Sequence, residues 1–226
     1  VLKGLAAEQA RRGISVTVAV TDRGNPVSQR LQAPYFQDLF HDAVALRAFP
    51  VSFSPLLWSF RMRDWLRRRI ARFDIVHVHG LYRFPPTYAA RTARRRNVPY
   101  VIRPHGALDP YMYDKSTAGS VPLKRVYERL FDMPNLNAAD AIHFTTVEER
   151  ERAEYLGLRA PSFVVPNGLD WKPFQVLPPR GALRARWGLG RCPVVLFLGR
   201  LHFKKGLDLL IPAFDAVRRQ IPDAQL

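Results

Sequence analysis

Residues 193–207 read Pro193-Val194-Val195-Leu196-Phe197-Leu198-Gly199-Arg200-Leu201-His202-Phe203-Lys204-Lys205-Gly206-Leu207, and they indicate the fold more clearly than any other stretch. An apolar run ends at Gly199, a basic loop follows, and Gly206 opens a helical segment. This order predicts a strand, a loop and a helix of an open α/β sheet, in which ligands bind at the carboxyl ends of the strands.

The loop carries groups that suit an anion. Arg200 offers a planar fork to phosphate oxygens, Lys205 offers a movable charge, and Gly199 allows close approach. The N-terminus of the following helix adds a partial positive charge. We expect these three residues to bind phosphate, and a solvated basic turn is the alternative. The loop matches neither a Walker sequence nor the G-x-G-x-x-G dinucleotide pattern.

Strand and helix patterns alternate through the rest of the chain. Short apolar runs indicate strands at residues 14–20, 44–53, 75–79, 99–103, 140–145 and 162–165. Helical spacing occurs at residues 1–12, 55–72, 85–96, 121–136 and 146–156. This alternation predicts an α/β protein with a Rossmann-like, doubly wound, mostly parallel sheet.

The alternation breaks in a proline-rich stretch before Val194. We therefore expect a Rossmann-like domain at residues 1–168, an interdomain linker at 169–192, and the start of a second Rossmann-like domain at 193–226. The sequence opens in a helix without an initiator methionine, and it closes on the first residues of a strand. We expect a first strand and most of the second domain to lie outside it.

Composition limits the class of protein. Hydrophobic residues make up 47% of the 226 residues, enough for a packed core, and the net charge of +16 favours anionic partners. Cys192 is the single cysteine and cannot form an internal disulfide, which fits a reducing compartment. The apolar runs are too short to span a bilayer.

Four segments, in this order, resemble the retaining nucleotide-sugar glycosyltransferases of the two-domain GT-B type, the group 1 glycosyltransferase family. They are Phe73-Asp74-Ile75-Val76-His77-Val78-His79-Gly80, Arg103-Pro104-His105-Gly106-Ala107-Leu108-Asp109, Val165-Pro166-Asn167-Gly168-Leu169-Asp170, and Gly199-Arg200 through Lys205-Gly206-Leu207. The resemblance implies an enzyme that moves a sugar from a nucleotide-sugar donor to a glycan or lipid-linked acceptor with retention.

The resemblance also implies a setting and a set of partners. Such enzymes build bacterial surface polysaccharides or glycolipids in the cytoplasm, many of them at the inner face of the cytoplasmic membrane. No cofactor or metal is expected, because basic side chains neutralise the leaving diphosphate. The family's acidic donor motif lies outside this sequence, so we expect the chain alone to be inactive.

Residue roles follow from the same resemblance. Arg200 and Lys205 match the basic pair on the donor diphosphate, and His105 matches a catalytic-site histidine near the donor sugar. The candidates for lining the cleft or the acceptor site are Gly80, Tyr82, Thr145, Thr146 and Asn167.

Several residues have competing interpretations. His77 and His79 share one face of a strand and could bind a metal with His105, but simple hydrogen bonding is the more common role of such residues. Asp109 and Asp114 could supply a general base, although turn formation is the more ordinary role of aspartate in a loop. Residues 146–149, Thr-Val-Glu-Glu, predict a capping box that opens a helix.

The arginine-rich helix at residues 61–72 leaves two interpretations open. Its arginines form a solvated face if the apolar side packs on the sheet, or they form a peripheral site for anionic lipid. The arginine clusters also permit a basic nucleic-acid-binding α/β module, although no recognised motif of that class is present. Another GT-B-like enzyme, such as a sugar-nucleotide epimerase or a phosphorylase, is the remaining alternative.

Overall fold

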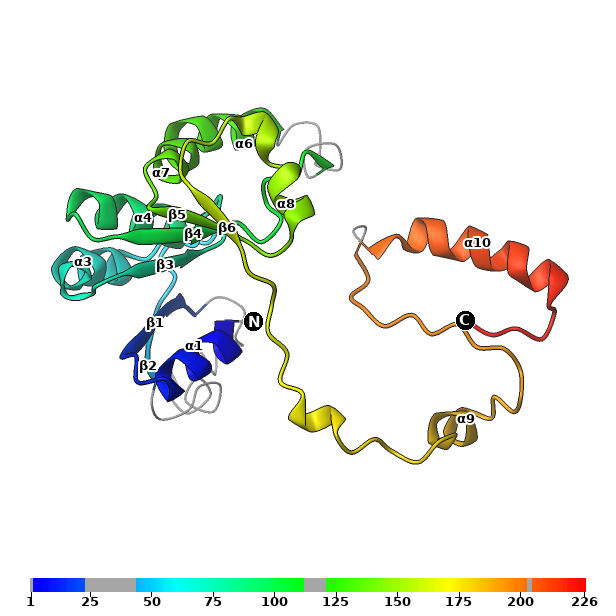
Figure 1. Cartoon of the computed structure of the whole chain (residues 1–226). Coiled ribbons are helices and arrows are strands. Elements are labelled where there is room, and N and C mark those ends of the chain that lie inside the picture. Colours follow the sequence, from blue (N-terminus) through cyan, green and yellow to red (C-terminus); the bar gives the residue numbers. More distant parts are fainter. Residues whose placement is uncertain (1, 23–43, 112–120, 203–204) are drawn as a thin grey trace. The chain divides into compact units, whose positions relative to one another are not determined.

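The computed structural model describes residues 2–22, 44–111, 121–202 and 205–226 (Figure 1). The chain divides into two compact units, Val1–Leu169 and Asp170–Leu226. Asp114 and the middle of the phosphate-binding loop, residues 203–204, lie outside the described residues.

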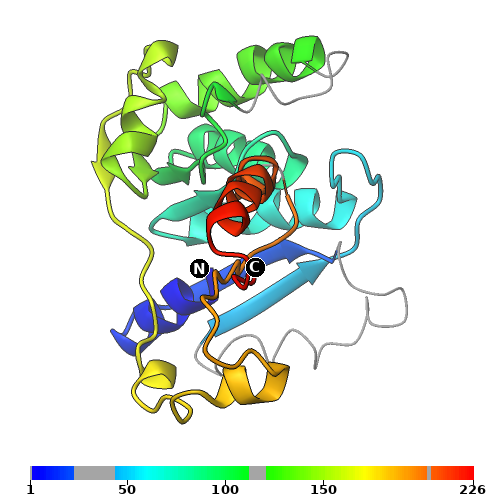
Figure 2. The same cartoon turned by 90° about the vertical axis from the view of Figure 1, so that its right-hand side faces the viewer.

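Unit 1 contains two parallel sheets (Figure 2). In the smaller sheet, β1 (Val16–Thr21) pairs with β2 (Val44–Phe49). The larger sheet has the order β3 (Val76–His79), β4 (Tyr100–Arg103), β5 (Ala141–Phe144) and β6 (Ser162–Val164). The predicted α/β class with parallel strands is therefore confirmed.

The expectation of one continuous sheet is not met among the described residues. A cavity of about 510 Å³ is lined by β1 and β3, and hydrogen bonds join β1 to β2 and β3 to β4. Apolar side chains from both strands line this cavity, for example Val18 and Val78. The two sheets therefore remain separate ladders within unit 1.

Helices follow the strands as the sequence pattern predicted, with shifted boundaries. Unit 1 contains α1 (Leu2–Arg11), α3 (Phe60–Arg69), η1 (Ile70–Arg72), α4 (Phe84–Arg95), α6 (Val121–Tyr127), the π-helical η3 (Glu128–Asp132), α7 (Met133–Asn137), α8 (Val147–Glu151) and η4 (Glu154–Leu156).

The helix expected from residue 55 begins only at Phe60, because the hydroxyl of buried Ser59 caps it. Its Oγ accepts a hydrogen bond from the amide of Met62 at 3.2 Å.

One face of the larger sheet forms the core. Alternate residues of the strands point to this face, among them Val78, Tyr100, Ile102, Ile142 and Phe144, and all five are buried. Helices α3 and α4 contribute buried side chains to the same hydrophobic cluster. The opposite face is therefore free to carry polar side chains.

Unit 2 contains η5 (Lys172–Phe174), α9 (Ala182–Trp187) and α10 (Leu207–Gln220). The strand predicted at residues 194–198 is wrong: the structure has a single parallel bridge, between Val194 and Gln225. Leu196 and Leu198 are 70% and 92% exposed. A parallel strand needs a neighbour along its whole length, and residues 170–226, as described, pair with this run at one position only.

No helix in the described part of the chain combines the length and the apolar character needed to cross a membrane.

Candidate functional site

A strained turn follows β4 and carries the predicted catalytic residue. His105 has a φ of 57° and Gly106 has a φ of 70°, so both lie in the left-handed region. That region suits glycine but costs energy for a histidine, which requires support from the surrounding structure. The turn places His105 beyond the carboxyl end of β4, where the sequence placed it.

Glu149 on α8 supports this turn. One carboxylate oxygen accepts a hydrogen bond from the amide of Gly106 at 2.5 Å. The other accepts from both the amide and the hydroxyl of Thr145 at 2.7 Å. Burial raises the pKa of Glu149, but these hydrogen bonds outweigh it and hold the pKa below its ordinary value. Glu149 is therefore a charged anchor that joins the β4 and β5 loops.

The predicted capping box is only half formed. The hydroxyl of Thr146 accepts a hydrogen bond from the amide of Glu149 at 3.0 Å, as an N-cap should. The glutamate reaches Thr145 instead of the cap residue, because its other oxygen binds Gly106 across the neighbouring loop. The motif thus serves the site as well as the helix.

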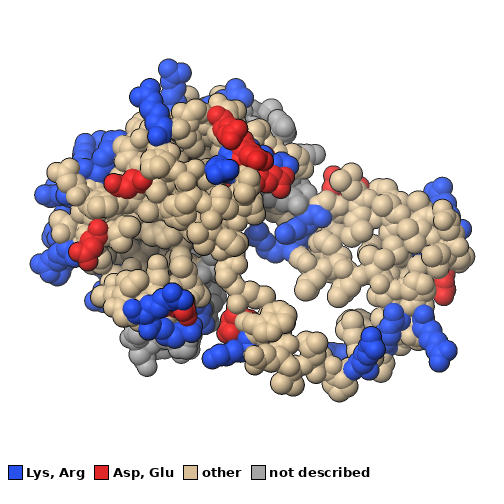
Figure 3. All heavy atoms as spheres, viewed as in Figure 1, with Lys and Arg blue, Asp and Glu red and all other residues tan. Residues whose placement is uncertain are grey.

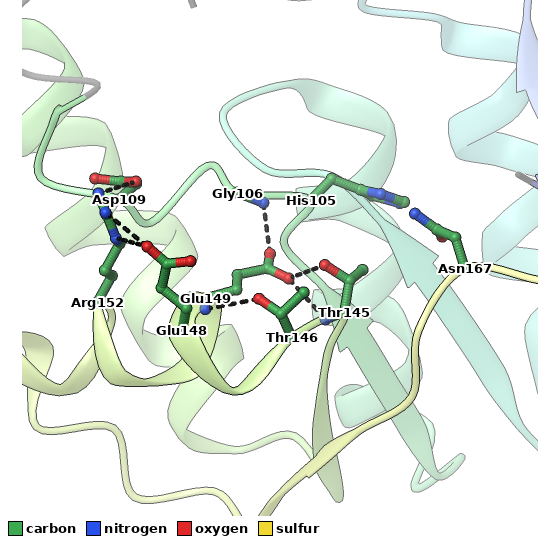
Figure 4. Close-up of a pocket in the computed structure, with 9 residues that line it drawn as sticks. All are labelled: His105, Gly106, Asp109, Thr145, Thr146, Glu148, Glu149, Arg152 and Asn167. Atoms are coloured by element: carbon green, nitrogen blue, oxygen red, sulfur yellow. Dashed lines mark hydrogen bonds and ion pairs between the residues drawn. The ribbon is translucent and has the colours of Figure 1, made fainter.

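These residues border a pocket of about 360 Å³ at the carboxyl ends of the strands (Figure 4). Asn167, which follows β6, lies at the end of the pocket where the imidazole of His105 lies (Figure 4). The pocket is lined by His105, Gly106, Asp109, Thr145, Thr146, Glu148, Glu149, Arg152 and Asn167. Its polar lining suits a ligand rich in hydroxyl groups.

A group of three charged residues forms the opposite end of the pocket. The guanidinium of Arg152 lies 3.2 Å from the carboxylate of Asp109 and 2.7 Å from that of Glu148. Asp109 also accepts a hydrogen bond from the amide of Tyr111 at 2.9 Å, as a turn aspartate does. Asp109, one of the two candidates for a general base, is therefore engaged in an ion pair.

Behind the pocket, polar side chains line the second face of the larger sheet. His77 and His79 alternate along β3, and their ring centroids lie 4.4 Å apart, which confirms that they share a face. Nδ1 of His79 lies 3.0 Å from Nε2 of His105. On the other side, Nε2 of His77 lies 3.4 Å from Nδ1 of His143. Four imidazoles, from β3, β5 and the turn after β4, therefore form a row.

Three imidazoles of the row, those of His77, His79 and His105, are held in an uncharged form. Burial, and next the interaction with His143, lower the pKa of His77 to about 4. Burial, and next the neighbouring His77, lower the pKa of His79 to about 3. Burial and Arg103 also lower the pKa of His105, although Glu149 opposes this change. At neutral pH these three side chains therefore act as hydrogen-bonding groups without charge.

Arg103 adds a buried cation to the same face. It is 2% exposed, it lies opposite His79 in the strand register, and its guanidinium donates a hydrogen bond to the side-chain oxygen of Asn167. Its Nε has no partner among the described residues. Burial lowers the pKa of Arg103, although Glu149 opposes this effect. Arg103 thus fixes the segment in which the chain leaves unit 1.

The structure brings four predicted residues together and leaves two outside the pocket. His105, Thr145, Thr146 and Asn167 all line it. Gly80 and Tyr82 do not belong to its lining.

Tyr82 instead contacts residues of α6 and η3. Its amide donates to Asp132 at 2.9 Å, its hydroxyl donates to Glu128, and the amine of Lys124 lies over its ring. The role of Tyr82 in lining the site of the acceptor substrate stays a prediction.

The phosphate-binding candidates lie in unit 2. Arg200 and Lys205 are both exposed. A Cβ added at Gly199 would lie 3.2 Å from the ring of Phe197 and 3.8 Å from Cδ of Lys205, so the lysine stem passes close to the glycine. Gly206, with a φ of 65°, then starts α10. The binding role of these residues stays a prediction.

Sequence reasoning missed the parts played by Arg103, His143 and Glu149. The alternation along β4 and β5 could have placed the first two on the face of His77 and His79. The contact between Glu149 and Gly106 spans 43 residues and leaves no local signal. In the described part of the chain, no group of three or more His, Cys, Asp or Glu residues is arranged to hold a metal ion.

Parallel sheets with a polar pocket at the carboxyl ends of their strands define the α/β class of protein, in which ligands bind at this edge of the sheet. The chain belongs to the glycosyl transferase 4-like family: residues 1–168 match the family described as "Glycosyl transferase 4-like domain".

Two curated relatives agree with this family. The chain is 40% identical over 92 residues to the GDP-mannose-dependent alpha-(1-6)-phosphatidylinositol monomannoside mannosyltransferase of Mycolicibacterium smegmatis, a match that covers 40% of the chain and 24% of the relative. It is 31% identical over 153 residues to the D-inositol 3-phosphate glycosyltransferase of Kineococcus radiotolerans, covering 66% of the chain and 34% of the relative. The matches thus span about a quarter to a third of these relatives.

Two solved structures share the fold. One is HepE from Anabaena, in complex with UDP and glucose, with a TM-score of 0.64 and 16% identity. The other is sucrose-phosphate synthase from Thermosynechococcus elongatus, with a TM-score of 0.58 and 17% identity. Each match covers 99% of this chain and 54% of the solved chain. The likeness concerns the fold alone, and it confirms the predicted GT-B type of α/β fold.

Proposed function

We propose that this protein transfers a sugar from a nucleotide-sugar donor to a glycan or lipid-linked acceptor with retention of anomeric configuration. Its place would be bacterial surface polysaccharide or glycolipid synthesis at the inner face of the cytoplasmic membrane. The proposal rests on the family match and on the relatives, whose names describe mannosyl and inositol-phosphate glycosyl transfer.

The single structural observation that carries the proposal is the braced His105 turn at the polar pocket. Glu149 holds the turn in its left-handed conformation, and His105, Thr145 and Asn167 border a space of about 360 Å³. A neutral imidazole beside amide and hydroxyl groups can hydrogen-bond sugar hydroxyls without attracting a cation. Preorganised polar groups of this kind stabilise charge that develops during transfer.

The carboxylates of the pocket bear on how retention would arise. A double displacement needs a carboxylate free to attack the anomeric carbon. Asp109 and Glu148 are paired with Arg152, and Glu149 is bound to Gly106 and Thr145. This supports a displacement in which the departing diphosphate, held by Arg200 and Lys205, carries the developing charge.

The donor is best sought among two nucleotide sugars. The mycobacterial relative is named for GDP-mannose, and the Anabaena structure contains UDP and glucose. The test uses the complete protein encoded by the reading frame that contains this chain. Labelled GDP-mannose and UDP-glucose are each supplied with a bacterial lipid extract, and the linkage of the product is read by NMR.

We expect transfer from one donor, giving a product with the donor's anomeric configuration, and we expect His105→Ala to reduce it by at least about 100-fold. An inverted product would overturn retention, and absence of transfer, hydrolysis and nucleotide binding with both donors would overturn the proposed function.

A peripheral contact with anionic lipid is part of the proposal. Met62, Leu66 and Ile70 pack into the core, which leaves the arginines of α3 on the outside. Figure 3 shows basic side chains gathered over the region of α3 and α4. The exposed arginines of these two helices and the turns that follow them are Arg61, Arg67, Arg68, Arg69, Arg72, Arg91, Arg94, Arg95 and Arg96.

The two helices present one surface, because Nη2 of Arg96 lies 3.5 Å from the carbonyl oxygen of Arg67. Each basic residue near an anionic bilayer contributes about 1 kcal/mol, so neutralising three should weaken binding roughly 100-fold at low salt.

Co-sedimentation with phosphatidylcholine vesicles, with and without phosphatidylglycerol, tests this contact. Changing Arg67, Arg68 and Arg69 to serine should abolish the preference for anionic vesicles. Changing Arg11, the last residue of α1, and the adjacent Arg12, which both pair with Glu8, should leave it nearly intact. Equal binding to both vesicle types would contradict the membrane contact, and tighter binding to duplex DNA would favour the nucleic-acid alternative.

A further inference from the structure

The imidazole of His105 has a neighbour that can set which of its nitrogens carries the proton. Nδ1 of His79 lies 3.0 Å from Nε2 of His105, and the ring centroids lie 5.2 Å apart. Both rings are uncharged at neutral pH, because burial lowers the pKa of each. A hydrogen bond between two neutral imidazoles contains one proton, so one ring must donate and the other must accept.

The charge of Glu149 decides the direction. Glu149 is ionised and binds the amide of Gly106, the residue that follows His105. Nε2 of His105 faces His79, and Nδ1 is the ring nitrogen closer to the backbone, so the negative charge that raises the pKa of His105 favours a proton on Nδ1. Arg103 lowers the pKa of both His79 and His105, so its charge does not distinguish the two rings.

We propose that His79 is a positioning residue which donates its Nδ1–H to Nε2 of His105 and thereby fixes the proton of His105 on Nδ1. His105 then offers the pocket a hydrogen-bond donor with a defined direction. The inference rests on the proposed function only in the identity of the ligand, a sugar hydroxyl or ring oxygen. The tautomer of His105 is set by the folded chain and does not depend on which ligand binds.

The row of histidines gives this arrangement further support. Nε2 of His143 lies 2.9 Å from the carbonyl oxygen of Val165, which can only accept, so that nitrogen carries a proton. His143 faces His77, and His77 stacks on His79 with ring centroids 4.4 Å apart. The ring of His79 is therefore held from one side by His77 while its Nδ1 is directed at His105.

The first experiment reads the tautomer directly. Imidazole nitrogen spectra of the uniformly ¹⁵N-labelled 226-residue chain at pH 7.5 distinguish protonated from unprotonated ring nitrogens. We expect His105 to show a protonated Nδ1 and an unprotonated Nε2. In His79→Phe we expect a mixture of both forms. In His79→Asn, whose side-chain amide can donate from about the position of Nδ1, the single form should be largely restored.

His77→Phe is the matched control. It changes the same residue type, on the same face of the same strand, but His77 does not contact the ring nitrogens of His105 through a hydrogen bond in the structure. Phenylalanine keeps an aromatic ring beside His79, so the tautomer of His105 should be unchanged in this variant. Backbone amide spectra of each variant report whether unit 1 is folded. If His79→Phe does not fold, the comparison of the wild-type chain with His79→Asn keeps the test valid.

The second experiment measures transfer by the complete protein with whichever of GDP-mannose and UDP-glucose it uses. Loss of one positioning hydrogen bond should lower kcat by about tenfold in His79→Phe with little change in KM for the donor, and His79→Asn should recover most of the rate. A protonated Nε2 in the wild-type chain, or an unchanged tautomer in His79→Phe, would overturn the inference. If neither donor is used while the tautomers behave as expected, the proposed function fails and the positioning role remains.

Discussion

At the scale of single residues, the site depends on ionised or polar groups that are held out of water. Glu149 is the clearest case, because one carboxylate accepts hydrogen bonds from Gly106 and twice from Thr145. A carboxylate that accepts three hydrogen bonds resists protonation. The three donors in turn need the ionised carboxylate as their acceptor. The left-handed backbone of His105 thus depends on a side chain from a different element.

Replacing Glu149 by alanine should therefore destabilise unit 1 and loosen the His105 turn. Leaving partly buried donors without an acceptor costs about 2 kcal/mol, which urea unfolding of the 226-residue chain would detect. Glu148→Ala is the matched control, because Glu148 is exposed and binds only Arg152 among the charged groups of the pocket. Equal unfolding midpoints for the two variants would show that Glu149 does not support the turn.

Arg103 should behave differently from Glu149. Its charge is buried and lowers the pKa of His77, His79 and His105. Arg103→Met should raise the pKa of these histidines, and the free energy of unfolding should stay constant or increase, because a buried charge without a carboxylate partner is replaced by an apolar side chain of similar length. Histidine titration by NMR and urea unfolding test this. A fall in any of the three pKa values would contradict it.

At the scale of elements, capping and packing decide where the helices begin. Helix α3 starts at Phe60 although the helical pattern extends back to residue 55, because the hydroxyl of Ser59 binds the amide of Met62. From that point Met62, Leu66 and Ile70 face the core at helical spacing. The cap thereby also fixes which side of α3 presents its arginines.

Ser59→Ala should lower the free energy of unfolding by about 1 kcal/mol through loss of this N-cap. Ser59 is 0% exposed, so water cannot easily replace the lost acceptor. Ser59→Asp, which retains an acceptor, should recover part of the loss if the carboxylate fits. Chemical denaturation monitored by the fluorescence of Trp65 and its neighbours supplies the measurement, and an unchanged midpoint for Ser59→Ala would be inconsistent with the cap.

At the scale of the whole molecule, buried ionisable groups make folding depend on pH. His77 and His79 have folded-state pKa values of about 4 and 3, below the ordinary value of 6.5. As the pH falls, these two histidines therefore become protonated in the unfolded chain before they do in the folded chain. Their contribution to the free energy of unfolding is complete above pH 6.5 and is lost as the pH falls below that value. Asp132 acts in the opposite direction, because burial raises its pKa to about 6.

These signs give a net prediction for unit 1. Between pH 6.5 and 5, His77 and His79 favour the unfolded state, and His105, whose pKa is also lowered, acts in the same direction. Asp132 favours the folded state, so about one more proton is bound on unfolding. The free energy of unfolding should fall by about 1–2 kcal/mol over this interval.

Urea unfolding across this pH range measures the slope, and replacing both His77 and His79 by asparagine should flatten or reverse it. A stability that rises as the pH falls in the wild-type chain would contradict the assigned pKa values.

Much of the fold could be predicted because its signals are local. The alternation of His77 and His79 with valine predicted strand β3 to within one residue and placed both imidazoles on one face. Local sequence did not predict correctly whether residues 194–198 form a strand. The apolar run is a local property, whereas a strand also needs a neighbouring strand to pair with, and only Val194 of this run forms a bridge.

The chain's own sequence determined the order of strands and helices, the face on which each side chain of β3 lies, and the position of His105 beyond a strand end. Only the tertiary structure decided that Glu149 would hold the His105 turn, that Asn167 would accept from Arg103, and that four histidines would form one row. The reason is physical: the carboxyl ends of parallel strands meet only when the sheet assembles, and the groups that meet there are separated by 43 residues or more along the chain in the first two contacts.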